Sequence, residues 1–139
     1  RLGLWKVHID ETGKICLNNK PLYQRLILDQ GYWEESGLTP PSAEAIKKDI
    51  ELAKAMGFNG ARLHQKVFEQ RFLYWADKLG YICWGEMASW GIDPAKPHTM
   101  SIFLREWLVS VFSYLTCLPL WAGAPTMKPG ENPTMACAN

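Results

Sequence analysis

The spacing of hydrophobic and polar positions predicts short strands in the first part of the chain. The two kinds of residue alternate over residues 4–9, which is the period of a half-buried strand, and residues 15–17 form a second strand after a turn. Residues 22–28 are mostly apolar and lead into polar residues, as expected for a strand buried in a parallel sheet. The pattern therefore predicts a short β segment followed by the first strand of such a sheet.

The hydrophobic period then changes to that of amphipathic helices. Ser42 is a suitable N-cap for a first helix that ends at Gly57, a second helix ends at Gly80, and a third covers residues 102–115. The three apolar faces consist of Ile46, Ile50, Ala53 and Met56, then Phe68, Phe72, Trp75, Ala76 and Leu79, and finally Phe103, Trp107 and Val111.

Two further strands, over residues 58–63 and 81–84, separate these helices. The resulting order of strand, helix, strand, helix, strand and helix is typical of βαβ units, in which parallel strands are joined by helices that cover the sheet. The predicted fold class is therefore α/β, with right-handed crossovers.

Polar residues stand directly after each of the three strands of the predicted parallel sheet. Asp29 follows the first strand, Arg62 and His64 end the second, and Glu86 follows the third. In a barrel of parallel strands the chemistry lies at the carboxyl ends, so we expect these four side chains at one rim. Each also has a structural alternative: a turn cap, a structural histidine, or partners in an ion pair.

The composition of the chain argues against several classes of binding partner and of cofactor. The net charge is +1 and no run of like charges occurs, which argues against a nucleic-acid groove or an anionic membrane surface. No apolar run approaches the roughly 18 residues of a membrane span. The four cysteines form no Cys-x-x-Cys pair, so we predict isolated thiols, no metal site and no cofactor. Because the chain begins at Arg1, we expect its natural start to be missing.

Seven tryptophans are many for 139 residues, and Trp33, Trp84 and Trp90 fall near predicted turns. Aromatic side chains at loops can stack on the apolar face of a sugar ring, whereas large aromatics also fill protein cores. The sequence leaves both interpretations open for these three residues.

Several blocks resemble, in order, the start of the catalytic barrel of glycoside hydrolase family 2, the β-galactosidase/β-glucuronidase-like enzymes. The resemblance covers residues 2–108. Its blocks are Leu17–Pro21, Leu28–Trp33, Asp49–Asn59, Arg62–His64, Tyr74–Gly80 and Trp84–Met87.

This resemblance implies a partial (β/α)8 TIM barrel. Residues 21–116 would form its first three βα units, residues 1–20 the end of a preceding β domain or a linker, and residues 117–139 an aberrant or disordered tail. It also implies a fragment of a retaining exo-glycosidase that hydrolyses terminal β-linked sugars in carbohydrate metabolism. The residues expected to bind this carbohydrate are Asp29, Arg62, His64, Glu86 and Trp90.

The chain departs from the family where catalysis would lie. Retaining enzymes use two carboxyl groups about 5–5.5 Å apart, and in the family the acid/base is a Glu after Asn at the end of strand four. Nothing here matches either carboxylate, so we assign no catalytic residue and expect the fragment alone to be inactive. His64 is one residue closer to Arg62 than in many relatives. After Leu108 the resemblance ends, and our hypothesis is a frameshift in the encoding DNA.

Three functions follow for the chain as it stands. The first is a piece of such a glycosidase, which we expect to self-associate through the open edge of its incomplete barrel. The second is a non-catalytic carbohydrate-binding half-barrel that uses tryptophans as stacking platforms. The third, a half-barrel acting on sugar phosphates, is disfavoured because no glycine-rich phosphate loop follows a strand.

Overall fold

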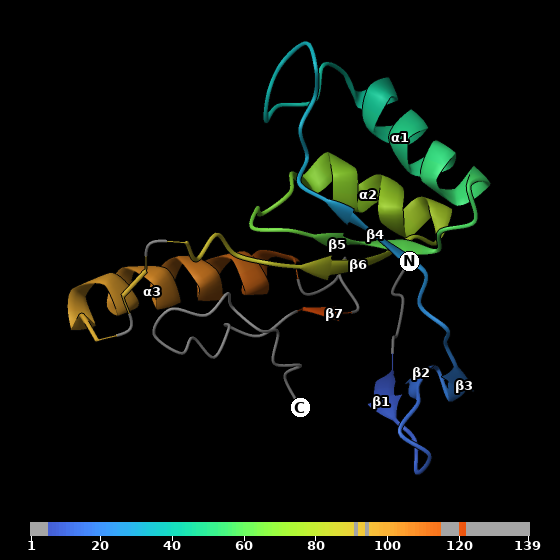
Figure 1. Cartoon of the computed structure of the whole chain (residues 1–139), viewed down its shortest axis with the longest axis horizontal. Coiled ribbons are helices and arrows are strands. Elements are labelled where there is room, and N and C mark those ends of the chain that lie inside the picture. The colour runs from blue at the N-terminus through green and yellow to red at the C-terminus, as the bar shows by residue number, and fades with distance from the viewer. Residues whose placement is uncertain (1–5, 91, 94, 115–119, 122–139) are drawn as a thin grey trace.

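Two sheets and three helices make up the part of the chain that the computed structural model describes, residues 6–90, 92–93, 95–114 and 120–121. One sheet is antiparallel with strand order β1-β2-β3, and the other has the order β4-β5-β6-β7 (Figure 1). The elements are β1 (Val7–Ile9), β2 (Ile15–Leu17), β3 (Lys20–Pro21), β4 (Leu26–Asp29), α1 (Ala43–Ala55), β5 (Gly60–Leu63), α2 (Gln70–Leu79), β6 (Ile82–Gly85), α3 (Pro97–Tyr114) and β7 (Leu120–Trp121).

The parallel arrangement predicted from the order of elements is confirmed. β4 pairs with β5, and β5 pairs with β6, in both cases in parallel. α1 and α2 connect these strands, and α3 connects β6 to β7, which is also parallel to its neighbour. Each connection is thus a βαβ crossover, and all four carboxyl ends lie at the same edge of the sheet.

The predicted first parallel strand was too long. β4 covers Leu26–Asp29 only, because the backbone before it is bonded elsewhere. Leu22 N donates to the carbonyl oxygen of Ile15 in the antiparallel sheet. The carbonyl of Tyr23 accepts from Asn59 Nδ2 at 2.8 Å, and Arg25 N donates to Asn59 Oδ1 at 2.8 Å. A side chain therefore takes the place of a strand partner.

The helix signals are confirmed for α1 and α2. Ser42 Oγ accepts from Ala45 N at 3.0 Å as the N-cap of α1, and Gly57 follows its end with φ +94°. Gly80 ends α2 in the left-handed conformation with φ +62°. Met56, expected on the buried face, is 75% exposed, because the helix ends there and the side chain projects beyond its packed stripe.

The third helix and the tail differ from the prediction. α3 begins at Pro97 rather than near residue 102, since proline fits the first helical position, where its missing N–H is not needed. Phe103 and Trp107 are buried, as their spacing predicted. β7 forms at Leu120–Trp121, where the sequence predicted disorder, because this segment pairs with Trp84 and Gly85 of β6. The other residues of the predicted tail lie outside the described residues.

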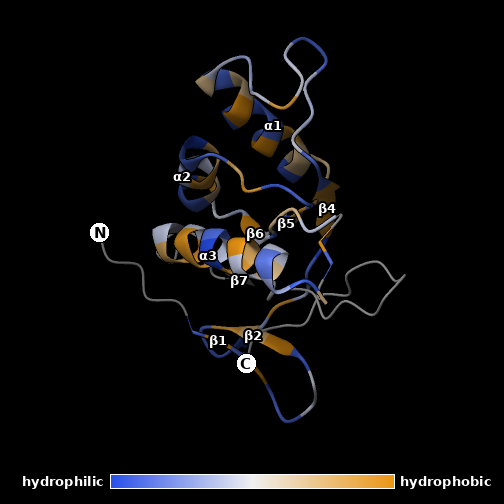
Figure 2. Cartoon of the chain, turned by 90° about the vertical axis from the view of Figure 1, so that its left-hand side faces the viewer, coloured by the Kyte–Doolittle hydropathy of each residue, from blue (hydrophilic) through white to orange (hydrophobic). Residues whose placement is uncertain are grey.

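The main core lies between the sheet and the helices α1 and α2. It combines Ile46, Ile50, Ala61, Leu63, Phe68, Phe72, Leu73, Ala76, Tyr81 and Cys83. On the opposite face of the sheet, Ile82 and Trp84 pack with Ile15, Leu22 and Leu26, so the antiparallel sheet covers part of that face. Figure 2 shows the three layers edge-on, with α1 and α2 on one side of β4–β6 and β1–β2 on the other.

A tight hairpin turn joins β1 to β2. Asp10 Oδ1 accepts from Thr12 N at 2.9 Å, from Thr12 Oγ1 at 2.7 Å and from Lys14 N at 2.9 Å. These hydrogen bonds lower the pKa of Asp10 from 3.8 to about 2, and the bond from the Thr12 hydroxyl has the largest effect. The turn is therefore stabilised by the ionised carboxylate.

Both cysteines within the described residues, Cys16 and Cys83, are free and buried. Burial, followed by the charge of Asp29, raises the pKa of the Cys83 thiol. Cys117 and Cys137 lie outside the described residues, so the predicted isolated thiols are found where the structure describes them.

Candidate functional site

The carboxyl ends of β4, β5 and β6 bring the predicted polar residues to one edge of the sheet. Asp29 of β4 pairs with Leu63 of β5, and Leu63 pairs with Gly85 of β6. His64 and Glu86 therefore follow the last paired residues of their strands by one position. The backbone N–H of His64 donates to the carbonyl oxygen of Asp29 at 2.7 Å, which continues the pairing past the strand. The register of the parallel strands thus places the backbones of these candidate residues at the same edge of the sheet.

Arg62 and Glu86 form an ion pair at this edge. Arg62 Nε lies 2.5 Å from Glu86 Oε1, and the side chains are 30% and 7% exposed, respectively. Glu86 Oε2 also accepts from the backbone N–H of Gln65 at 3.1 Å. A carboxylate buried this deeply needs a charge partner and hydrogen-bond donors, and Glu86 has both. Each of its oxygens therefore accepts a hydrogen bond from a protein donor.

His64 follows β5 at the same edge, and its ring contacts the loop after β4. Gln30 Nε2 and His64 Nδ1 are 3.1 Å apart, within hydrogen-bond distance. The imidazole is half-buried.

Asp29 is at the same edge but is not brought together with Arg62 and Glu86. Side chains alternate between the faces of a strand. Ile27 of β4 packs into the core under the helices, whereas Leu26 packs beside Trp84 on the other face, so Asp29 shares the helix side with Ile27. Its Oδ1 accepts from Gly31 N at 2.8 Å, the turn cap that the sequence left open as an alternative.

Burial raises the pKa of Asp29, although the bond from Gly31 and the charge of Lys66 oppose the shift. Lys66 Nζ itself donates to the carbonyl oxygens of Gly31 at 3.3 Å and of Leu38 at 2.7 Å. Asp29 and Lys66 together therefore hold the loop between β4 and α1 against the rest of the rim.

The tryptophans divide between core and surface. Trp84 is 7% exposed and its Nε1 donates to Gln24 Oε1 at 2.6 Å, so of the two interpretations that the sequence left open, the core one applies to it. Trp33 is half-buried and packs against the main core. Trp90, four residues beyond Glu86, is 64% exposed and is available for stacking on a ligand.

Two further residues at this edge, Gln65 and Ser89, are not marked by the sequence as site residues. Gln65 has φ +54°, a conformation that side chains other than those of Gly, Asn and Asp rarely adopt. Its Oε1 accepts from Ser89 N at 2.8 Å, and its Nε2 donates to Ser89 Oγ at 3.3 Å. Ser89 is 1% exposed. No local sequence signal marks either residue, because both are defined by contacts between separate loops.

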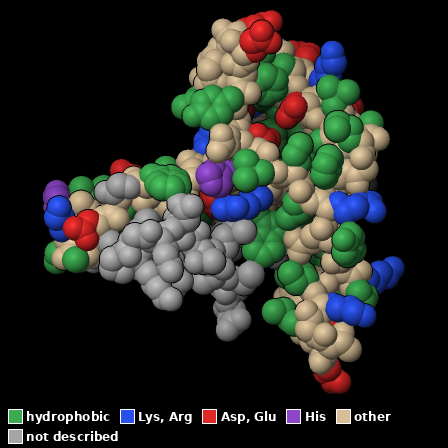
Figure 3. Space-filling model, in the orientation of Figure 1, with side chains coloured by type: hydrophobic (Ala, Val, Ile, Leu, Met, Phe, Trp, Pro, Cys, Tyr) green, Lys and Arg blue, Asp and Glu red, His purple; other side chains and the backbone are tan. Residues whose placement is uncertain are grey.

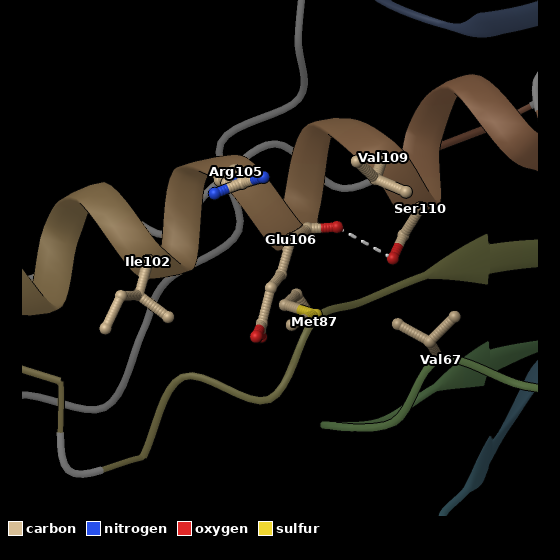
Figure 4. A pocket seen from close by; sticks show the side chains of 7 residues that line it. All are labelled: Val67, Met87, Ile102, Arg105, Glu106, Val109 and Ser110. Carbon is tan, nitrogen blue, oxygen red and sulfur yellow. Dashed lines mark hydrogen bonds between the residues drawn. The ribbon is translucent and has the colours of Figure 1, made fainter.

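An open groove of about 590 Å³ adjoins this edge, between α3 and the loops that follow β5 and β6 (Figure 4). Val67 and Met87 contribute from the loops, so the groove begins one residue beyond Glu86. From α3 come Ile102, Arg105, Glu106, Val109 and Ser110. Ser110 Oγ donates to the carbonyl oxygen of Glu106 at 2.9 Å and is thereby engaged within the helix. The groove is mostly apolar.

Charge is spread thinly over the visible surface. Figure 3 shows basic and acidic side chains scattered among hydrophobic ones over the described residues, without a broad patch of one sign on the face in view. Among the described residues there is also no cluster of three or more His, Cys, Asp or Glu that could bind a metal. No helix in this part of the chain is long and apolar enough to span a membrane.

The fold is similar to part of solved bacterial β-glucuronidases. Bacteroides uniformis β-glucuronidase 3 has a TM-score of 0.75 and 21% identity, over 86% of this chain and 16% of that one. Parabacteroides merdae β-glucuronidase has a TM-score of 0.71 and 20% sequence identity, over 86% of this chain and 15% of that one. Ruminococcus gnavus β-glucuronidase has a TM-score of 0.69 and 20% identity, over 87% of this chain and 22% of that one.

At this level of identity the likeness concerns the fold, and the chain spans between 15% and 22% of the length of these structures. No family model and no curated protein matches the sequence.

Proposed function

We propose that this chain is part of a retaining exo-glycosidase of the family 2 type, which hydrolyses terminal β-linked sugars. The observation that carries the proposal is the Arg62–Glu86 ion pair, with its carboxylate buried, at the carboxyl end of a parallel sheet. In α/β sheets ligands bind outside the carboxyl ends of the strands. The likeness of fold to β-glucuronidases supports the same assignment.

We further propose that residues 21–116 are the first three βα units of a (β/α)8 barrel. Residues 1–20 would end a preceding β domain. Because Leu120–Trp121 pairs in parallel with β6, this segment would stand at the place of the fourth barrel strand, and the part of the tail foreign to the barrel would be sought after it. Within the described residues β4 is paired on one side only, and Leu28 on it is 54% exposed. Such an open edge favours self-association of the isolated chain.

Arg62, His64 and Glu86 would bind sugar hydroxyls. The Arg62 guanidinium, 30% exposed, and the half-buried His64 ring would contact hydroxyl groups, and Glu86, 7% exposed, would hold Arg62 in place for this contact. Trp90 would stack on a sugar ring. Asp29 would act on the substrate through the loop that it holds at Gly31.

The chain would bind sugar without cleaving it. Retention of configuration needs two carboxyl groups about 5–5.5 Å apart on the same sugar. Asp29 and Glu86 point to opposite faces of the sheet, so they do not form such a pair. The two catalytic carboxylates would belong to the remainder of the enzyme.

The exposure of Trp90 favours a second candidate function, a carbohydrate-binding half-barrel that is complete without catalysis. Both candidates predict binding of sugar by this chain. They differ in whether a longer chain from the same locus contains a catalytic carboxylate pair, which sequencing of the neighbouring DNA decides.

Two measurements on the purified chain test the proposal. Ligand-observed NMR with the methyl β-glycosides of glucuronic acid, galactose and mannose should detect binding of at least one sugar, and Glu86→Gln should weaken it. Nitrophenyl β-glycosides of the same sugars should show no turnover. Absence of binding to every sugar contradicts the proposal, and turnover that is lost in Glu86→Gln would show that the catalytic carboxylates were wrongly assigned.

A further inference from the structure

We propose that Gln65 and Ser89 are positioning residues, which fix the Glu86 carboxylate and, through it, the Arg62 guanidinium for contact with sugar. This inference rests on the proposed function for its ligand, but the positioning itself is measurable without one. We refer to Gln65 and Ser89 together as the brace.

The first observation is the backbone of Gln65. With φ +54° it is the one residue other than glycine and asparagine that has a positive φ among the described residues. Residues held in this conformation persist only where surrounding contacts enforce it, and they concentrate at functional sites. The conformation turns the N–H of Gln65 towards Glu86, where it donates to Oε2 at 3.1 Å.

The second observation is the set of contacts that enforces this conformation. The carboxamide of Gln65 is bonded at both ends to one residue: Oε1 accepts from Ser89 N at 2.8 Å and Nε2 donates to Ser89 Oγ at 3.3 Å. Ser89 is 1% exposed, so these polar groups have little access to water as an alternative partner. The brace thereby ties the loop after β5 to the loop after β6.

The third observation is what the brace leaves for a ligand. Glu86 is held from two directions, by Arg62 Nε on Oε1 and by the Gln65 backbone on Oε2. The Glu86 side chain is 7% exposed and that of Arg62 is 30% exposed, so the guanidinium is the part of the pair that a ligand meets. A guanidinium held in one orientation presents N–H donors at fixed separation, which fit the adjacent hydroxyl oxygens of a pyranose, so the ligand class is a vicinal diol.

Two substitutions separate positioning from folding. Gln65→Gly removes the carboxamide and adopts a positive φ without strain, but it leaves Ser89 N, on a residue that is 1% exposed, without its acceptor. The thermal midpoint should therefore fall, and exchange is compared at a temperature where the variant is still folded. Ser89→Ala removes only the hydroxyl and keeps the bond from Ser89 N to Gln65, so its effect should be smaller. Gln70→Ala, at an exposed position at the start of α2, is the matched control.

The measurement is the exchange of the Arg62 Nε–H proton with water, followed by ¹⁵N NMR on the full chain. In the wild type this proton is protected by its bond to Glu86. We expect exchange at least about tenfold faster in Gln65→Gly, an intermediate rate in Ser89→Ala, and the wild-type rate in Gln70→Ala.

Binding of methyl β-glucuronide, β-galactoside or β-mannoside, whichever the wild type binds, should weaken in the same order. If folded Gln65→Gly exchanges the Arg62 Nε–H proton at the same rate as the wild type, the positioning role of the brace is overturned, even if sugar binds. A wild type that binds none of the sugars, with exchange accelerated as described, overturns instead the proposed function and the ligand class.

Discussion

The two ends of the parallel sheet are formed by the same strands but use polar groups in opposite ways. At the amino end the side chains that form hydrogen bonds across the fold are uncharged: Asn59 bonds to the backbone of Tyr23 and Arg25, and Gln24 bonds to Trp84. At the carboxyl end the carboxylate of an ion pair is buried and Gln65 has a positive φ. Neutral groups thus complete the fold at the amino end, whereas the carboxyl end holds a charge out of water.

This difference agrees with the division of labour known for βα architectures, in which residues at the amino ends of the strands serve stability and those at the carboxyl ends serve ligands. It gives a measurable contrast. Substitutions at the amino end should change the free energy of unfolding and leave the site intact, and substitutions at the carboxyl end should do the reverse.

The largest effect is expected for Gly60→Ala at the amino end of β5. An added Cβ would overlap the carbonyl oxygen of Ile82 and lie 2.7 Å from Leu26 Cδ2, so the backbone of the central strand would have to shift. We expect a loss of about 3 kcal/mol, at the upper end for overpacked sites, in urea unfolding. Gly13→Ala meets no atom within 4 Å and is the control, with a smaller loss from its positive φ. Equal losses in both variants would contradict the packing argument.

Asn59→Ala should follow, with a loss of about 2 kcal/mol, because it removes two hydrogen bonds and leaves backbone groups of two residues without their partner. Urea unfolding measures this loss, and Gln70→Ala serves as the control. The exchange rate of Arg62 Nε–H should stay at its wild-type value. Faster exchange in a fully folded Asn59→Ala would show that the two ends are not independent.

Glu86→Gln tests the carboxyl end. The substitution preserves shape but removes the charge that faces Arg62, so sugar affinity should fall about tenfold, equivalent to 1.4 kcal/mol. Titration by NMR measures the affinity, and the effect on unfolding should be smaller than that of Asn59→Ala. A large loss of stability with unchanged affinity would reverse the assignment of the two ends.

A smaller effect of opposite sign is expected for Asp29→Asn. Burial raises the pKa of Asp29 above its ordinary value of 3.8. At pH values just above 3.8 the folded state therefore binds more protons than the unfolded state, and the free energy of unfolding falls as the pH rises through this range. Asparagine should therefore stabilise the chain at pH 7 by no more than about 1 kcal/mol and abolish this pH dependence. Thermal unfolding between pH 4 and 7 measures both, and a destabilised Asp29→Asn contradicts the sign.

Asp10 gives the smallest effect and the opposite pH dependence. Its pKa is lowered to about 2 in the folded chain, so its contribution is complete above the ordinary value of 3.8 and is lost as pH falls towards 2. Comparison of the wild type with Asp10→Asn over this range should show the difference disappearing in acid. A difference that persists below pH 2 would assign the effect to packing.

The sequence predicted the regular parts of this fold because their signals are local. Ser42 begins α1 and the glycines Gly57 and Gly80 end the first two helices, as expected. Of the predicted α2 face, Phe72 and Ala76 are buried, whereas Phe68 precedes the helix and the buried Leu73 was not predicted. The prediction failed at β4, where Asn59, distant in the chain, replaces a strand partner for the backbone. It left the role of Trp84 open for the same reason, since nothing adjacent shows that Ile15 and Leu22 cover this side chain.

The candidate site was predictable to the level of strand ends. The register placed Arg62, His64 and Glu86 at one edge, but the face on which each side chain lies depends on strand boundaries that the hydrophobic pattern does not fix to a single residue. Asp29 falls on the opposite face for this reason. Gln65 and Ser89 stayed hidden because their function arises from contact between two loops.

The most direct test of the contrast between the two ends is a protein-observed NMR titration of the wild-type chain with the same three methyl β-glycosides. The account predicts that one sugar shifts the resonances of His64, Gln65 and Trp90 and slows exchange of Arg62 Nε–H, while the amides of Gln24 and Asn59 do not move. Shifts centred on Gln24 and Asn59, or none with any of the three sugars, would contradict it.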